Sequence, residues 1–282
     1  MHLLISGLVA AALFLHVDAA PGTFVYAGCS PSRYAPNTAF ESNLNSLLAS
    51  MAPTASSGAT YSSFTAPGAG LAEAESPAAY GLYQCRGGLR PGECVACVRD
   101  TVARIGAVCA GAAAASLQSD GCYVRYGGAG AGASAAYHSC GAGTSGDPWF
   151  LRSRDAVLSE LQGVDAPAAS GSGSGGYKVS ASGPVRGVAQ CLGGIAAGDC
   201  AACLAHAAAQ LRGTCGAALA ADVYLVQCSV RYWTDGANQL RSSQDNPEDD
   251  AGRTLAIAIG ISAGVAALVV FISFLRKACE AH

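Results

Sequence analysis

Charged side chains are scarce in this sequence. Asp, Glu, Lys and Arg together make up 12% of the 282 residues, and the formal net charge is −3. A nucleic-acid-binding domain needs a basic face to neutralise phosphates. This composition supplies none, so we predict no nucleic-acid partner.

Residues that carry catalysis are also few. Of the five histidines, only His138 and His206 lie between the apolar segments at the two ends of the chain. They do not occupy matching positions in the repeat described below, and the sequence has neither a nucleophile elbow nor an HExxH motif. We therefore predict a protein that is not an enzyme, with no catalytic residue and no cofactor.

Cysteine, in contrast, is abundant and repeats in a fixed pattern. A C-x8-C-x2-C stretch with Gly-Gly after its first cysteine begins at Cys85 and recurs at Cys191. Two more cysteines follow each copy, and each cysteine of this set lies 106 positions before its counterpart. Five cysteines in constant register indicate a tandem repeat of one domain.

The cysteine count predicts an oxidising compartment. The 13 cysteines divide into six for each repeat and one, Cys279, near the C-terminus. Even sets in a secreted chain indicate disulfides. A zinc site is the alternative, since His206 follows the second C-x2-C, but the first repeat has Asp100 at that place. We therefore predict disulfides and no metal.

Both ends of the chain are apolar. Residues 1–20 have the apolar run and small-residue end of a signal peptide. Residues 254–275 contain no charge and, as a helix of about 33 Å, would span a bilayer. Arg276 and Lys277 follow this segment, so the positive-inside rule places the tail in the cytoplasm. The sequence predicts a type I, single-pass membrane protein.

Two features of this C-terminal region suggest further roles. Gly260 and Gly264 form a G-x-x-x-G pattern, which favours association of membrane helices into homo- or hetero-oligomers. The alternative is that an Ala/Gly-rich chain produces this spacing by chance. Cys279 lies beside the predicted membrane boundary and is a candidate for S-palmitoylation; the alternative is an unmodified thiol.

Local patterns predict several elements. Residues 24–29 look like a strand, and Thr38 and Glu41 have the spacing of a capping box ahead of an apolar helical face. We expect further helices over residues 93–105 and 148–161, the latter capped by Asp147. Residues 223–233 are predicted as one strand.

The cysteine signature resembles the ginkbilobin-homologous, or stress-antifungal, domain. Two such domains with a signal peptide and one membrane helix resemble the plasmodesmata-located protein family. The resemblance implies an α+β fold of two tandem disulfide-stapled domains, each with two helices packed on an antiparallel sheet, followed by a single transmembrane helix. The disulfides that it implies are Cys85–Cys94, Cys97–Cys122 and Cys29–Cys109, then Cys191–Cys200, Cys203–Cys228 and Cys140–Cys215.

Mannose-binding members of the domain family carry an Asn, an Arg and a Glu at three fixed places. This chain has Ser30, Ser116 and Gly127 there in the first repeat. The second repeat has Gly141, Asp222 and Trp233. The polar triad is therefore missing from both copies, which argues against a mannose lectin of that kind and leaves other cell-wall glycans open.

The resemblance also implies a function. We expect a non-enzymatic protein of the plasma membrane at plasmodesmata, which regulates traffic between cells by promoting callose deposition. The extracellular domains would bind an unidentified ligand, either a cell-wall glycan or a receptor ectodomain. The alternative is a glycan-binding or antifungal defence receptor of the general plasma membrane. The predicted segments are a signal peptide (1–20), the first domain (21–127), a linker (128–136), the second domain (137–235), an acidic stalk (236–253), the transmembrane helix (254–275) and a cytoplasmic tail (276–282).

Overall fold

The computed structural model describes residues 22–66, 78–128, 136–163 and 176–234. The predicted signal peptide, stalk, transmembrane helix and tail lie outside the described residues, as do Gly260, Gly264 and Cys279. Within the described ranges, none of the helices is both long and apolar enough to cross a membrane.

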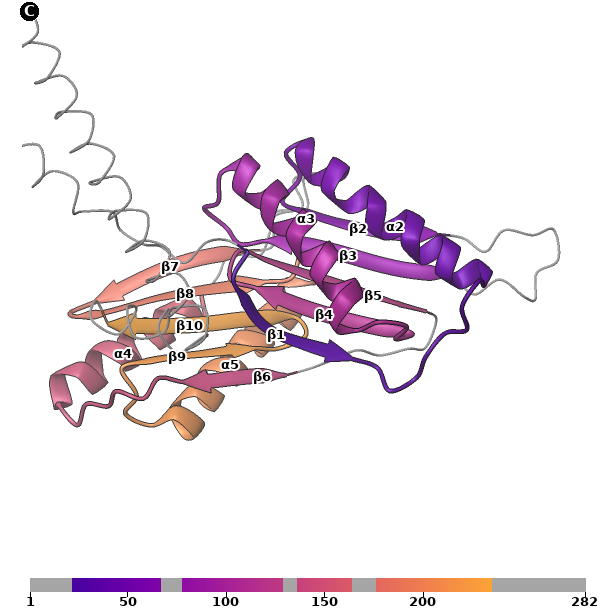
Figure 1. Ribbon diagram of the computed structural model, residues 1–282. Coiled ribbons are helices and arrows are strands. Elements are labelled where there is room, and N and C mark those ends of the chain that lie inside the picture. Colours follow the sequence, from indigo (N-terminus) through magenta and orange to yellow (C-terminus); the bar gives the residue numbers. More distant parts are fainter. Residues whose placement is uncertain (1–21, 67–77, 129–135, 164–175, 235–282) are drawn as a thin grey trace, which may run out of the picture. The chain divides into compact units, whose positions relative to one another are not determined.

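The first domain is a five-stranded antiparallel sheet with two helices on one face (Figure 1). The spatial order of its strands is β1-β4-β5-β3-β2. Because the last strand of the domain, β5, lies in the centre of the sheet, segments that are distant in the sequence share one core. In chain order its elements are β1 (Phe24–Cys29), α2 (Ala39–Ser56), β2 (Tyr61–Ala66), β3 (Ala79–Cys85), α3 (Pro91–Val108), β4 (Ala114–Ser119) and β5 (Cys122–Gly128).

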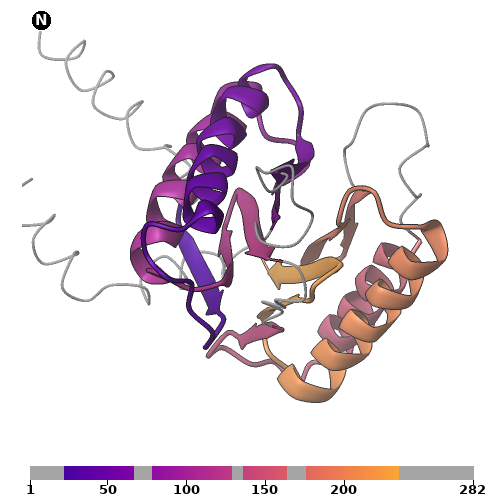
Figure 2. The same cartoon turned by 90° about the vertical axis from the view of Figure 1, so that its right-hand side faces the viewer.

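The second domain repeats this architecture with strand order β6-β9-β10-β8-β7. In both domains the two helices lie together on one face of their own sheet (Figure 2), and none of the helices in the described part of the chain belongs to the other face. The elements are β6 (Tyr137–Cys140), α4 (Pro148–Leu161), β7 (Tyr177–Ser182), β8 (Val185–Cys191), α5 (Ala197–Cys215), β9 (Ala220–Tyr224) and β10 (Cys228–Thr234). The predicted fold of two tandem domains, each with helices on an antiparallel sheet, is confirmed.

Helix starts follow from the capping residues. Asp147 Oδ1 accepts the amide of Trp149 at 2.9 Å at the start of α4, as predicted. At the start of α2, Thr38 Oγ1 accepts the amide of Glu41 at 3.4 Å. The Glu41 carboxylate accepts from the amide of Asn37 at 2.6 Å, one residue earlier than in the predicted capping box.

Each core lies between the helices and the covered face of the sheet. Leu44 and Met51 from α2 and Val98 from α3 are buried in the first core. Leu161 and Leu204 occupy the places of Met51 and Val98 in the second. Many other core positions are Ala or Cys, so each core is small, and the disulfides compensate by restricting the unfolded chain.

Six disulfides join the elements of the two domains. In each domain one bond ties the first strand to the end of the second helix, and two tie that helix to the central strands. The pairs are Cys29–Cys109, Cys85–Cys94, Cys97–Cys122, Cys140–Cys215, Cys191–Cys200 and Cys203–Cys228. These are the pairs that the resemblance implies, and they occupy the sulfur atoms that a zinc site would need.

Three boundaries differ from the sequence-based expectations. The helix predicted over residues 93–105 is longer at both ends, since α3 runs from Pro91 to Val108. The single strand predicted over residues 223–233 is wrong, because β9 ends at Tyr224 and β10 begins at Cys228. The apolar residues Leu225 and Val226 at the start of this turn conceal it. At the end of the first domain, β5 runs to Gly128, one residue into the predicted linker, because Gly128 is still paired with Ala79 of β3.

Candidate functional site: a cavity between the two domains

The two domains contact each other through a reciprocal pair of glutamines. The Gln84 side chain donates to the carbonyl of Cys191 at 2.9 Å and accepts from the amide of Gly193 at 2.8 Å. The Gln190 side chain donates to the carbonyl of Cys85 at 3.0 Å and accepts from the amide of Gly87 at 3.2 Å. Gln190 is the repeat counterpart of Gln84, so the contact has pseudo-two-fold symmetry.

The Gly-Gly pairs of the cysteine motif belong to the same contact. A Cβ atom on Gly87 would lie 2.2 Å from Cγ of Tyr177, and one on Gly193 would lie 2.4 Å from Cγ of Tyr61. Each tyrosine begins the edge strand of the opposite domain, β7 or β2. Glycine is therefore required at the first place of each pair so that the aromatic ring can approach the backbone.

Tyrosines form a second part of the contact. Tyr26 of β1 and Tyr137 of β6, which lie three residues before equivalent cysteines, stack with ring centroids 5.1 Å apart. Tyr224 packs against both rings at 5.8 and 6.2 Å. Offset aromatic pairs of this kind stabilise beyond their buried area. Burial, followed by the proximity of Tyr123 and Tyr224, raises the pKa of the Tyr26 hydroxyl, which stays protonated.

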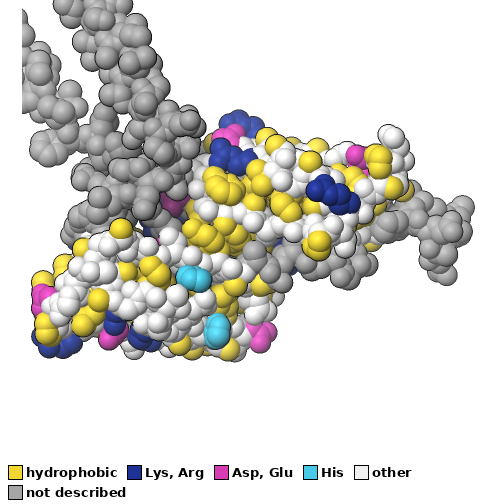
Figure 3. Space-filling view, turned by 60° about the horizontal axis from the view of Figure 1, so that its bottom comes forward, with side chains coloured by type: hydrophobic (Ala, Val, Ile, Leu, Met, Phe, Trp, Pro, Cys, Tyr) yellow, Lys and Arg dark blue, Asp and Glu magenta, His cyan; other side chains and the backbone are white. Residues whose placement is uncertain are grey.

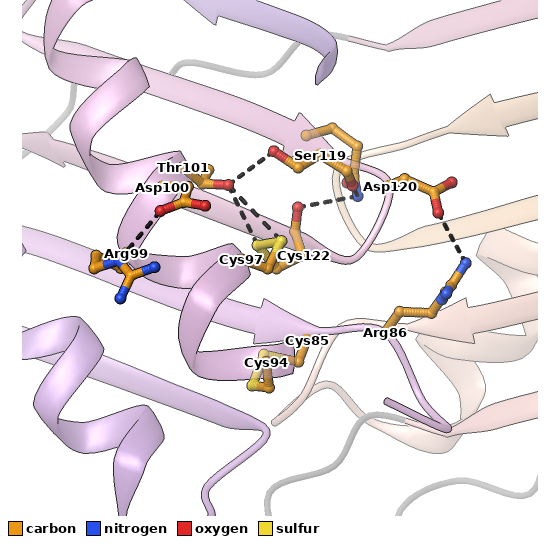
Figure 4. Close-up of a disulfide and its surroundings, with 11 residues drawn as sticks. Cys85, Arg86, Cys94, Cys97, Arg99, Asp100, Thr101, Ser119, Asp120 and Cys122 are labelled. Atoms are coloured by element: carbon orange, nitrogen blue, oxygen red, sulfur yellow. Dashed lines mark hydrogen bonds and ion pairs between the residues drawn. A yellow bond between two sulfur atoms is a disulfide. The ribbon is translucent and has the colours of Figure 1, made fainter. Parts of the chain in front are cut away.

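One carboxylate connects the domains electrostatically. Asp120, in the turn between β4 and β5, pairs through Oδ2 with Arg86 at 3.0 Å (Figure 4). Its Oδ1 pairs with Arg231 of the second domain at 2.8 Å. The Arg231 guanidinium also lies over the Trp233 ring, 5.4 Å from its centroid. The Asp120 side chain is 11% exposed, so this network is shielded from most of the solvent.

These groups line a cavity of about 270 Å³ at the contact. Its walls combine the Arg86–Asp120–Arg231 network with aromatic rings and with aliphatic side chains of the second domain. Burial is the main cause that raises the pKa of the Tyr123 and Tyr177 hydroxyls. Both therefore remain neutral hydrogen-bonding groups at physiological pH. Such a mixture of apolar surface and a few oriented polar groups is typical of a small-molecule site.

Two of the three positions of the missing mannose triad lie beside the same residue in each domain. In the first domain, the amide of Ser30 donates to the carbonyl of Ala114 at 2.8 Å, and Gly127 pairs with Ala114 on the neighbouring strand. In the second, the amide of Gly141 donates to Ala220, which pairs with Trp233.

The side chains at these positions are unsuited to the mannose chemistry. Ser116 and Asp222 are buried, and Gly127 and Gly141 have no side chain. Trp233 differs because it lines the inter-domain cavity. The position that holds the glutamate in mannose-binding members therefore lines the inter-domain cavity in this chain.

The two histidines that the sequence analysis considered do not line the cavity. His138 on β6 and His206 on α5 are both exposed. The histidines visible in Figure 3 form two separate patches, and neither residue lines the cavity.

The sequence analysis missed the two glutamines and the ion network around Asp120. Gln84 and Gln190 stand directly before equivalent cysteines, so the matched register offered a signal for them. Asp120 offered none, because its counterpart is Val226, whereas Arg231 is matched by Arg125 and so offered the same register signal.

The fold and the contact define the class of the protein: it is a tandem pair of disulfide-bonded α+β domains that pack symmetrically on each other. The profile of the salt stress response/antifungal family matches residues 28–129 and 139–235. The chain therefore belongs to this family, as a member with two domains in tandem.

Individual relatives narrow the comparison further. The chain is 40% identical over 259 residues to plasmodesmata-located protein 8 of Arabidopsis thaliana, with 90% of this chain and 89% of the relative covered. It is 41% identical over 274 residues to plasmodesmata-located protein 6 of the same plant, with 93% and 91% covered. The resemblance to this group is confirmed.

A solved structure agrees with the fold. The crystal structure of the tandem DUF26 ectodomain of the Arabidopsis thaliana cysteine-rich receptor-like protein PDLP8 matches with a TM-score of 0.65 and 38% sequence identity. The match covers 76% of this chain and 98% of that one.

Proposed function

We propose that this protein is a non-enzymatic type I membrane protein of plasmodesmata that regulates traffic between plant cells by promoting callose deposition. Its two extracellular domains act together as one binding module. The single observation that carries the proposal is the similarity along 90% of the chain to plasmodesmata-located protein 8.

The contact between the domains supports a module that works as one unit. Gln84 and Gln190 satisfy backbone groups of the opposite domain, and the cavity is walled by both domains. A ligand that enters this cavity would contact both domains at once. We infer that the predicted membrane segment, residues 254–275, restricts this module to the cell surface.

Location in living tissue tests the proposal. The full-length chain, tagged at its C-terminus, is expressed in leaf epidermis together with callose staining and a dye that spreads between cells. We expect paired puncta across shared walls, coincident with callose, and reduced spread of the dye. An even outline of the cell with unchanged dye spread would instead favour a glycan-binding or defence receptor of the general plasma membrane.

A further inference from the structure

The charge of the inter-domain cavity favours an anionic ligand. Arg86, Asp120 and Arg231 are the charged residues among its described walls, which leaves one net positive charge. Each oxygen of Asp120 already accepts from one guanidinium. A guanidinium carries five N–H donors in a planar fork, so Arg86, whose side chain is 35% exposed, retains donor capacity toward the cavity.

The rest of the wall favours a ring with an apolar face. Tyr123, Tyr177 and Trp233 contribute aromatic surface, against which the C–H face of a sugar can pack. The Tyr177 hydroxyl is a neutral donor and acceptor for ring hydroxyl groups. Gln84 and Gln190 bind backbone groups across the domain contact, so they hold the walls together.

The size of the cavity limits the ligand. Its volume of about 270 Å³ lies near the lower end of the range for small-molecule sites, on the order of 300 Å³. This accommodates one or two sugar rings at the cavity itself, with any further rings in solvent.

We propose that the inter-domain cavity binds a saccharide that carries a carboxylate, a uronic acid residue, with the carboxylate paired to Arg86 and the ring against the aromatic wall. This ligand class rests on the proposed function, since it identifies what the extracellular module binds. The ligand is either a free oligosaccharide or the end of a wall polymer, which share this chemistry.

Calorimetric titration of the full-length chain in detergent tests the ligand class. The probes are trigalacturonate, a neutral trisaccharide of the same length, and inorganic sulfate. We expect trigalacturonate to bind, and its affinity to fall as sodium chloride is raised, because salt screens the charge pairing. Equal affinity for the neutral trisaccharide, or an affinity insensitive to salt, would overturn the proposal. Sulfate that competes fully at equal concentration would also overturn it, because the ring would then contribute nothing.

Substitution of the arginine tests the site. Arg86→Gln should weaken trigalacturonate binding roughly ten-fold or more, the effect of losing a charge-assisted hydrogen bond. Arg86→Lys should restore part of the affinity. The matched control is Arg99→Gln, which breaks the exposed pair with Asp100 on α3 and should leave binding unchanged. If Arg86→Gln and Arg99→Gln bind alike, the cavity is not the site.

The salt dependence and the neutral probe use the unmodified chain, so the test holds even if Arg86→Gln does not fold. Failure of this proposal is distinct from failure of the proposed function. Puncta at plasmodesmata without uronate binding would remove the ligand class alone. Uronate binding with an even distribution over the cell surface would remove the plasmodesmal function alone.

Discussion

The domain contact has two ends that are related by the repeat: one contains Arg86 and Asp120 of the first domain, and the other contains the equivalent residues of the second. The two ends share the same strand and loop positions but differ in their side chains. At one end the first domain presents Arg86 and Asp120. At the other end the second domain presents their repeat counterparts, Leu192 and Val226. One backbone hydrogen bond is common to both ends: the amide of Arg86 donates to Gly121 at 2.8 Å, and that of Leu192 donates to Gln227 at 2.7 Å.

This difference separates what the repeat needs for folding from what one copy has acquired. The glutamines, the Gly-Gly pairs and the stacked tyrosines occur on both sides, so they hold the domains together. The ion network occurs on one side, so symmetric assembly does not require it. The network nevertheless joins the two domains, and Arg86, the more exposed of its two arginines, is the group that the uronate proposal uses.

The two tryptophans allow the unfolding of the two domains to be measured separately. Trp149 and Trp233 both lie in the second domain, and the first domain has none. Tryptophan fluorescence therefore reports unfolding of the second domain, whereas far-ultraviolet circular dichroism reports both. Coincident transitions indicate that the domains unfold as one unit.

The largest effect should come from removing one helix-to-sheet disulfide. Cys97→Ala with Cys122→Ala, or Cys203→Ala with Cys228→Ala, should lower the free energy of unfolding by about 2–5 kcal/mol. The two bonds have the same sequence separation of 25, so we expect the two costs to agree within about 1 kcal/mol. Denaturant titration followed by both probes measures each cost.

The surroundings of these two bonds sharpen the test. In the first domain, Thr101 contacts Cys122 Sγ at 3.3 Å and Ser119 Oγ at 2.8 Å (Figure 4). The repeat counterparts of Thr101 and Ser119 are Ala207 and Leu225. Thr101 keeps its hydroxyl partner when the sulfurs are removed, so no buried polar group is left unsatisfied. A first-domain cost that exceeds the other by several kcal/mol would contradict this account.

Alanine at the close-approach glycines should give the next largest effect. Gly87→Ala or Gly193→Ala places a methyl group against a tyrosine ring of the opposite domain, and overpacking of this kind costs about 1–3 kcal/mol. Because the contact is symmetric, the two costs should be similar, and the fluorescence and dichroism transitions should separate.

A matched pair of controls lies at the start of the helices that follow these loops. Gly92 and Gly198 are repeat counterparts in the first turns of α3 and α5, and a Cβ atom on either meets nothing within 4 Å. Alanine at these positions should leave stability unchanged or raise it by about 0.4–1 kcal/mol. Equal effects of Gly87→Ala and Gly92→Ala would disprove the close approach.

Neutralising the shared carboxylate should have a smaller effect. Asp120→Asn leaves Arg86 and Arg231 without their common anion, which costs several kcal/mol when such a network is fully buried. Since these arginine side chains are 35% and 20% exposed, solvent screening reduces the expected loss to about 1–2 kcal/mol. Trigalacturonate affinity should hold or rise in this variant, because the cavity gains positive charge. Urea titration and calorimetry measure the two quantities, and a joint fall in both would contradict our assignment of Asp120.

The sequence predicted the parts of the fold that depend on local spacing. Cysteine register revealed the repeat, and the apolar faces with Thr38 and Asp147 as caps located α2 and α4. The turn between β9 and β10 was missed because none of its residues, Leu225, Val226 and Gln227, is of a type that favours turns. The first repeat has Asp120-Gly121 at the equivalent place, which is a hairpin signal that alignment of the two copies would have transferred.

Local sequence patterns could not predict the candidate site. It depends on which sheet faces meet, and Arg231 lies 111 residues from Asp120 in the chain. Matched glutamines and glycines could indicate a symmetric contact, because a symmetric interface uses the same residues twice. Asymmetric partners leave no such trace in a single sequence.

The smallest expected effect comes from making the two ends alike. Val226→Asp puts a carboxylate at the repeat counterpart of Asp120, where Arg125 corresponds to Arg231. The gain over Val226→Asn, which matches the shape without the charge, should be about 0.2–1 kcal/mol at neutral pH, as for other partly exposed pairs. It should disappear below about pH 4, where the carboxyl group is protonated. Urea titrations of the two variants at both pH values measure it. If Val226→Asp is no more stable than Val226→Asn at either pH, Arg125 cannot take the role of Arg231, and the two ends differ in backbone geometry as well as in side chains.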